Sequence, residues 1–237
     1  MERRNPRRTV LPGDDLEDVR EFRPGENTYV ADGRIRAGAV GSTDYRGNTV
    51  SVNPAGGRYV PKGGDTVIGV ISDVGPSNWM IDIKAPWPAP LHVSEVPWKV
   101  EFGDTTSFLT LEDVVLIKIL NVDEGKKVSA TMKDAGLRKI EGGRLVEIDH
   151  NKISRVIGKA GSMISMIKDM TDCRMTVGQN GRIWIDGEGI NADAAAAAIK
   201  KIEAEANMPN LTERIEDFIA EVLPESHTEH DEEEVSE

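Results

Sequence analysis

The sequence predicts a multidomain, mainly β protein that includes one α+β domain near its C-terminal end. Up to Met132, short runs of alternating apolar and polar residues are separated by Gly, Pro, Asn and Asp, a pattern typical of strands and turns. Helical patterns follow later, after Ser162 and in the alanine-rich stretch beyond Asn191. A further helical pattern begins at Leu211 and ends before Pro224. These observations predict four consecutive segments.

The composition fits a globular protein of a reducing compartment. The 237 residues are enough for two or three small domains with apolar cores. A single cysteine, Cys173, excludes a disulfide framework and a cysteine-rich zinc site. The longest apolar run, Val114 to Leu120, is too short to span a membrane, and the basic stretch Met1 to Arg8 has no apolar region behind it. We therefore expect a cytoplasmic protein without a signal peptide.

The net charge of −12 is concentrated at the C-terminal end. From Pro209 to Glu237 there are eleven acidic residues and one basic residue, Arg214, so this segment carries −10. The preceding residues carry only −2 together, and local basic patches can act there. Residues 209–237 are predicted to form an amphipathic helix from Leu211 to Val222, followed by a disordered acidic tail from His227 to Glu237.

Residues 1–58 are predicted to form a small β-rich domain. Alternating runs such as Thr28–Val30 and Thr49–Val52 indicate short strands. The turn signals Asp32-Gly33 and Arg46-Gly47-Asn48 separate such runs.

Residues 59–134 are predicted to form a five-stranded barrel of the OB-fold type. Short alternating runs at close spacing are typical of a barrel or a sandwich. Barrels of this type bind single strands through stacking aromatics and a polar groove. The predicted strands are residues 66–73, 79–83, 90–95, 114–121 and 127–132.

Three residues of this barrel are candidates for contacts with a single-stranded nucleic acid. Trp79 and His92 are candidates to stack on bases, and Lys84 is a candidate to contact a phosphate. The alternatives are that Trp79 belongs to the core and that His92 only fixes a loop by hydrogen bonds.

Residues 135–208 predict the order strand, helix, Gly-x-x-Gly, helix, strand, strand, helix. Ser162 is the predicted N-cap of the second helix, and Asn191 is that of the third. The predicted elements are a strand at 144–148, a helix at 152–157, a helix from 162, strands at 174–177 and 182–186 around a turn at 178–181, and an alanine-rich helix after 191.

The Gly-x-x-Gly loop is the strongest candidate binding site. Glycines let a backbone approach phosphates closely, and the helix that follows offers unpaired N–H groups and the positive end of its dipole. Nearby lysine and arginine side chains favour phosphate contact. The predicted RNA-binding residues of this site are Gly158, Lys159, Ala160, Gly161, Ser162, Lys152 and Arg155. The alternative is that the two glycines only turn the chain in a small α+β domain.

The sequence lacks the motifs that would indicate the alternative of an enzyme. The four histidines, at positions 92, 150, 227 and 230, lie in separate contexts. No nucleophile elbow, Walker loop or metal-spaced ligand set is present in the sequence. We therefore expect no catalytic residue, no metal site and no cofactor.

The element order around the loop resembles a type-one KH domain, whose loop clamps about four nucleotides of a single strand.

The barrel resembles the RNA-binding domain first described in ribosomal protein S-one. It departs from that pattern in the proline-rich insertion Ala85–Pro90, which could restrict or re-aim the RNA surface. The matching residues are Gly69-Val70-Ile71, Trp79, the segment Leu91-His92-Val93-Ser94-Glu95, and Val122, Asp123, Lys127 and Ser129.

The domain order, together with Val10–Asp14 and Gly56–Gly69, resembles the KH-containing cap subunit of the archaeal RNA exosome. The resemblance covers residues from about 8 to 222. It implies three copies on a hexameric ring of phosphorolytic subunits, with residues 1–58 holding the ring; the alternative is a cap mixed with the zinc-ribbon subunit. It also implies a non-catalytic protein that captures A-rich 3′ ends of single-stranded RNA and feeds them to the ring. The alternative is a free-standing RNA chaperone or transcription-elongation factor.

Overall fold

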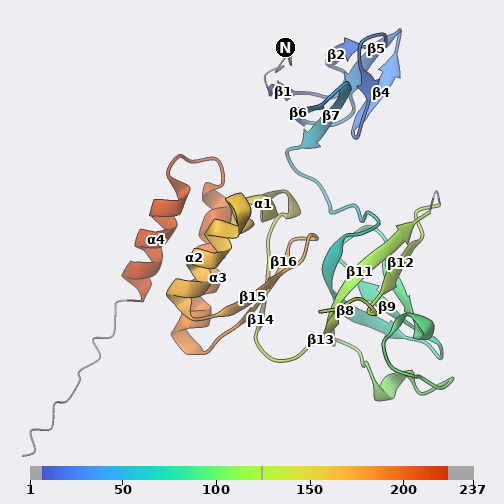
Figure 1. Ribbon diagram of the computed structural model, residues 1–237, viewed down its shortest axis with the longest axis vertical. Helices are drawn as coiled ribbons and strands as arrows, with labels where there is room; N and C mark the ends of the chain where they lie inside the picture. Colours follow the sequence, from blue (N-terminus) through green and yellow to red (C-terminus); the bar gives the residue numbers. More distant parts are fainter. Residues whose placement is uncertain (1–6, 124, 224–237) are drawn as a thin grey trace, which may run out of the picture. The chain divides into compact units, whose positions relative to one another are not determined.

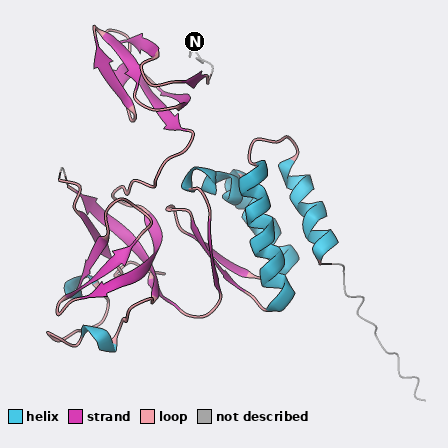
Figure 2. Ribbon diagram, turned by 180° about the vertical axis from the view of Figure 1, so that it is seen from behind, coloured by secondary structure: helices cyan, strands magenta, loops and turns pink. Residues whose placement is uncertain are grey.

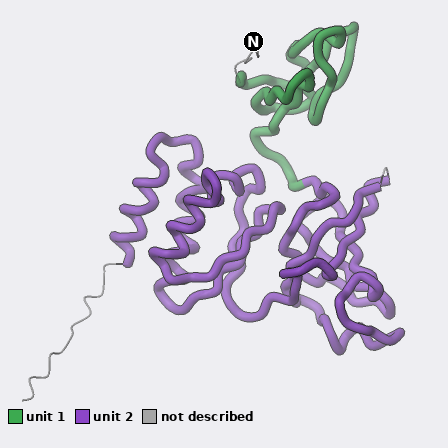
Figure 3. The backbone as a smooth tube through the Cα atoms, in the orientation of Figure 1, with its two compact units in different colours: residues 1–59 green, residues 60–237 purple. Residues whose placement is uncertain are grey.

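The computed structural model describes residues 7–123 and 125–223, and the chain divides into two compact units (Figure 3). The first unit comprises Met1–Tyr59 and the second Val60–Glu237. The tail predicted to be disordered, His227 to Glu237, lies outside the described residues. In the described part of the chain, no helix has the length and apolar character needed to cross a membrane.

The first unit consists of two small sheets around a compact apolar core. Asp32 and Gly33 join two of its strands with φ angles of 53° and 73°, which matches the type I′ turn that the Asp-Gly pair predicts. One sheet has the order β1-β6-β7-β3 and the other β2-β5-β4. The strands are β1 (Thr9–Val10), β2 (Asp15–Asp18), β3 (Arg23–Pro24), β4 (Thr28–Ala31), β5 (Arg34–Ala37), β6 (Gly41–Arg46) and β7 (Thr49–Pro54). The buried residues are Val10, Leu16, Ile35, Ala37, Val50 and Val52.

The second unit begins with the predicted five-stranded barrel, which is confirmed. Its strands follow the order β12-β10-β9-β8-β11, and an additional pairing of β12 with β11 closes the sheet on itself (Figure 1). The short strand β13 (Arg138–Ile140) pairs with β11 and was not predicted, because three residues with two cations show no alternation. The barrel strands are β8 (Thr66–Val74), β9 (Asn78–Asp82), β10 (Ala89–His92), β11 (Val114–Val122) and β12 (Val128–Thr131).

The remainder of the second unit has the predicted type-one KH topology. Its antiparallel sheet has the order β14-β16-β15, and the helices cover one face of it (Figure 2). The final helix α4 (Leu211–Val222) packs on α2 and α3 through the buried residues Ile215 and Ile219. The other elements are β14 (Arg144–Glu147), the 3-10 helix η3 (His150–Lys152), α1 (Ile153–Ile157), the 3-10 turn η4 (Lys159–Gly161), α2 (Ser162–Thr171), β15 (Arg174–Val177), β16 (Arg182–Asp186) and α3 (Gly189–Glu205).

Both helix caps predicted for this domain are wrong. The N-cap of α2 is Gly161 and not Ser162, which already has helical backbone angles. The N-cap of α3 is Glu188, and Asn191 lies inside the first turn of the helix. A polar residue near a helix start predicts the cap only to within a residue or two, because the preceding chain decides where helical angles begin.

Candidate nucleic-acid interface

Gly158 holds a backbone conformation that only glycine adopts. Its φ of 74° and ψ of −179° lie in a region closed to residues with a side chain. A Cβ atom built on Gly158 would lie 2.7 Å from both the Cβ and the backbone nitrogen of Met163. The first glycine of the loop is therefore required by the fold itself, because it lets α1 end directly against the start of α2.

The rest of the loop presents backbone to solvent. Ala160 and Gly161 are left-handed, with φ of 53° and 84°, and a Cβ on Gly161 would meet no atom within 4 Å. Lys159, Ala160 and Ser162 are exposed. The Ser162 N–H donates to the Lys159 carbonyl, but no side chain caps the first turn of α2, so the next N–H groups of this turn remain available to an anion.

The three predicted cations lie in this loop or in the two short helices that lead into it. Lys152 ends η3, Arg155 lies in α1, and Lys159 lies in the loop itself. None of these three side chains forms an ion pair with a described residue, whereas Arg174 on β15 pairs with Asp186 at 2.6 Å. Unpaired cations beside free helix N–H groups form a site for phosphates.

The stacking role predicted for Trp79 is corrected by its position. Its side chain is fully buried in the barrel core, and its indole Nε1 donates a hydrogen bond to the Leu109 carbonyl at 3.1 Å. A ring without an exposed face cannot stack on a base. We therefore remove Trp79 from the candidate interface and assign it to the core, the alternative that the sequence left open.

His92 remains exposed at the edge of the barrel. Its Nδ1 accepts a hydrogen bond from the Ser94 backbone N–H at 3.1 Å and lies 2.8 Å from the Ser94 hydroxyl. These contacts cap the short helix η1 (Val93–Glu95), so the ring fixes a loop by hydrogen bonds. The exposed part of the imidazole is still accessible to a ligand.

Lys84 is held at a joint between the barrel and the KH domain. Its Nζ donates to the Ile148 carbonyl at 3.0 Å and lies 3.4 Å from the Glu147 carboxylate. This charge already has a partner, so we also remove Lys84 from the predicted phosphate contacts.

Asn180 is a central residue of this joint and was not predicted to have any role beyond a turn. Its fully buried side chain donates to the carbonyls of Ile68 (2.8 Å) and Ile83 (2.9 Å), and accepts from the Ile68 N–H at 3.3 Å. Gly178, two residues before Asn180, allows the close approach to the barrel, since a Cβ on it would lie 2.7 Å from the Ile68 backbone nitrogen. The turn Gly178-Gln179-Asn180-Gly181, with two amides between glycines, was the available signal for a close backbone contact.

Arg182 bridges the two domains with its guanidinium. Its Nε donates to Glu147 at 2.8 Å, and its other nitrogens donate to the carbonyl and the carboxylate of Asp82. Burial by itself would raise the pKa of Asp82 and of Glu147, but the hydrogen bonds and charge of Arg182 outweigh it and hold both pKa values below their usual range. Both carboxylates therefore stay ionised at neutral pH.

An apolar patch completes the joint. Ile68 and Leu116 of the barrel pack with Ile140 and with Trp184 of β16. The Trp184 indole donates to the Gly142 carbonyl at 2.9 Å, and the Arg138 guanidinium lies 5.9 Å from its ring centroid. Apolar contact, a buried amide and a bridging guanidinium together fix the KH domain on the barrel.

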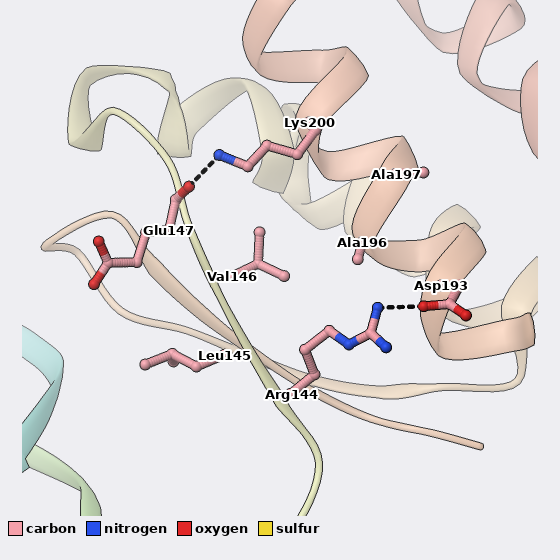
Figure 4. Close-up of a pocket in the computed structure, with 8 residues that line it drawn as sticks. All are labelled: Arg144, Leu145, Val146, Glu147, Asp193, Ala196, Ala197 and Lys200. Atoms are coloured by element: carbon pink, nitrogen blue, oxygen red, sulfur yellow. Dashed lines mark hydrogen bonds and ion pairs between the residues drawn. The ribbon is translucent and has the colours of Figure 1, made fainter. Parts of the chain in front are cut away.

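A groove of about 470 Å³ lies between β14 and α3 (Figure 4). Arg144 forms an ion pair with Asp193, and Lys200 donates to the Glu147 carbonyl. Because both cations are already paired, this groove is a weaker candidate for phosphate binding than the Gly-x-x-Gly loop.

A closed five-stranded barrel joined to a type-one KH domain with an exposed Gly-x-x-Gly loop is the architecture of an RNA-binding protein. Comparisons with known proteins give the family. Three family models match in chain order: "Exosome complex exonuclease RRP4 N-terminal region" over residues 9–44, "RRP4, S1 domain" over 58–102, and "KH domain" over 143–190.

Curated relatives agree along most of the chain. The Rrp4 exosome complex component of Methanosarcina mazei is 42% identical over 90% of this chain and 82% of its own length. That of Thermoplasma volcanium is 41% identical over 91% of both chains. A solved structure described as an exosome complex RNA-binding protein matches with a TM-score of 0.65 and 36% identity, over 70% of this chain and 97% of the other. The chain belongs to the Rrp4 family of exosome complex components.

Proposed function

We propose that this protein is a non-catalytic exosome subunit that captures single-stranded RNA 3′ ends and feeds them to the phosphorolytic ring. The observation that carries the proposal is the Gly-x-x-Gly loop, with its uncapped helix start and the unpaired cations Lys152, Arg155 and Lys159. Backbone amides and cations hold phosphates without reading sequence, which suits an entry port. The preference for A-rich ends belongs to the same proposal and would arise from stacking strength.

The first unit supports docking on a partner protein. Five large apolar side chains in this small unit are left exposed, at 38–58% of their surface. They are Leu11, Val19, Tyr29, Val30 and Val40. A free-standing RNA chaperone, the alternative function, has no need of such a surface. We therefore propose the hexameric ring as the partner, in the cytoplasm, with three copies of this chain per ring or a mixture of this chain and the zinc-ribbon cap subunit.

The test of RNA capture uses a matched pair of double variants. Lys159 and Ala160 are exposed, and Asp and Asn both tolerate the left-handed backbone of Ala160. Lys159→Asp with Ala160→Asp should weaken binding of an A-rich RNA by at least tenfold, because two negative charges face the phosphates. Lys159→Asn with Ala160→Asn should weaken it less. Equal affinity of the wild type and the Asp pair would refute the proposed site.

The test of assembly is the native mass of the chain mixed with ring subunits, followed by degradation of an A-tailed RNA with phosphate. A ring with three copies of this chain that degrades RNA faster than the bare ring supports the entry-port function. RNA binding without association would favour the free-standing factor instead.

A further inference from the structure

The proline-rich insertion between β9 and β10 holds a tryptophan in a stiff loop. In Ala85-Pro86-Trp87-Pro88, the ring of Pro86 fixes its own φ, and Pro88 restricts Trp87 to extended conformations. A loop of this kind loses little conformational entropy when a ligand binds its side chain.

Trp87 differs from the other three tryptophans. Trp79 and Trp184 are buried and donate hydrogen bonds to Leu109 and Gly142, respectively. Trp98 stacks on Phe108 with ring centroids 5.9 Å apart and an angle of 12° between the planes. The Trp87 ring is partly exposed, and among the described residues it has neither a hydrogen-bond partner nor an aromatic partner. Trp98 is also partly exposed, but Phe108 already stacks on its ring, so Trp87 is the better candidate to stack on a ligand.

The loop of Trp87 emerges at the joint with the KH domain. Asn180 holds the Ile83 carbonyl, and Lys84 donates to the Ile148 carbonyl at 3.0 Å. Ile148 in turn leads through η3 and α1 into the Gly158–Gly161 loop. The ten residues from Ile148 to Gly158 are mostly helical and span about 15 Å, while Trp87 is at most about 10 Å along the chain from Lys84. Both sites are thus within reach of one single strand.

We propose that Trp87 stacks on a base of the RNA strand whose phosphates are held at the Gly158–Gly161 loop. The barrel and the KH domain then form one continuous site, with the unpaired cations Lys152 and Arg155 between its two ends. This inference rests on the proposed RNA-binding function and adds a stacking residue to it. The KH loop takes about four nucleotides, and an OB barrel extends a site to as many as about 16. Short RNA therefore fills the KH loop alone, and longer RNA also reaches Trp87.

The experiment compares A-rich oligonucleotides of four and twelve nucleotides on the full-length chain. Trp87→Ala should weaken binding of the longer RNA by about 5- to 150-fold, the range measured for removing a stacked aromatic, and leave the shorter RNA unaffected. Trp87→Phe should retain most of the affinity. Unchanged binding of the twelve-nucleotide RNA by Trp87→Ala would overturn the proposal.

Tryptophan fluorescence provides a second readout if Trp87→Ala does not fold. Saturation with the longer RNA should quench the wild type and should not quench Trp87→Phe. If the RNA still quenches the fluorescence of Trp87→Phe, another tryptophan stacks on the base. That result would overturn the inference about Trp87 but not the proposed RNA binding. A wild type that binds neither RNA would instead overturn the proposed function itself.

Discussion

Arg182 of the KH domain and Asp82 of the barrel form an ion pair in which Nη2 and Oδ2 are 2.5 Å apart. The side chain of Arg182 is 7% exposed, whereas that of Asp82 is 49% exposed. The buried guanidinium thus reaches the joint from the KH side and satisfies two carboxylates at once, since Glu147 is its second partner. Arg182 is thus a charged link between the two domains, and its loss should loosen the joint.

Replacement of Arg182 by Met should lower the free energy of unfolding by about 1–3 kcal/mol. Breaking a buried pair costs about 3–5 kcal/mol, but water partly solvates the two carboxylates once their partner is gone. Arg182→Lys should cause a smaller loss of unfolding free energy, because the lysine ammonium keeps the charge but lacks the planar set of N–H donors of the guanidinium. Urea unfolding measures the change. A wild-type midpoint for Arg182→Met would show that the pair does not stabilise the joint.

Replacement of Asn180 by Ala should lower the free energy of unfolding by about 2–4 kcal/mol, because it leaves buried backbone groups of Ile68 and Ile83 without partners. Gln179→Ala is the matched control, since its contact with the Thr66 N–H is exposed and water can replace it. Thermal unfolding of both variants measures the difference. Equal losses would contradict the central role assigned to Asn180.

The local patterns of the sequence predicted the elements well. Strands β15 and β16 lie at the predicted residues, since alternation around a Gly-rich turn depends on neighbours in the chain. The Gly-x-x-Gly spacing likewise indicated a turn between two helices, but it did not indicate the left-handed backbone of Ala160.

Contacts between distant residues could not be predicted in this way. Lys84 finds its partner Ile148 at a separation of 64 residues, and Asn180 contacts Ile68 at 112. A lysine in a polar loop and an asparagine in a turn look the same whether they face solvent or another domain. The burial of Trp79 likewise depends on Leu109, 30 residues away.

The two loop glycines should respond differently to substitution. Gly158→Ala should lower the free energy of unfolding by about 2–5 kcal/mol, because a strained backbone and the contact with Met163 add together. Gly161→Ala meets open space and should cost only the left-handed backbone, about 1–2 kcal/mol. Chemical denaturation of the two variants measures both losses of unfolding free energy. Similar losses would mean that α2 shifts to accept a side chain at Gly158.

Truncation of Trp79 should affect stability and spare RNA binding. Trp79→Ala removes a fully buried ring, which typically costs about 3–5 kcal/mol. Trp79→Phe should lose less, because it keeps most of the apolar volume and forfeits the bond to Leu109. RNA affinity is measured at a temperature where the variant is folded. Weakened RNA binding by a folded Trp79→Ala protein would show that Trp79 contributes to the RNA-binding site.

The stability of the KH domain should fall as the solution is acidified, because of His150. Burial lowers the pKa of His150, the charge of Asp149 raises it, and that of Lys84 lowers it further, so the net result lies below the ordinary value. The unfolded chain therefore binds the proton more readily than the folded chain. The contribution is fully present above about pH 6.5 and is lost as the pH falls from there through the folded pKa.

His150→Gln should flatten the decline in unfolding free energy between about pH 6.5 and 5. Asp149→Asn should extend the decline to lower pH, because it removes the charge that favours the imidazolium while an amide oxygen can still accept the bond from the Asn151 N–H. Urea unfolding at a series of pH values measures both slopes. If His150→Gln keeps the wild-type slope, the acid sensitivity arises from other groups, and the carboxylates of Asp82 and Glu147 at the joint become the next candidates below pH 4.5.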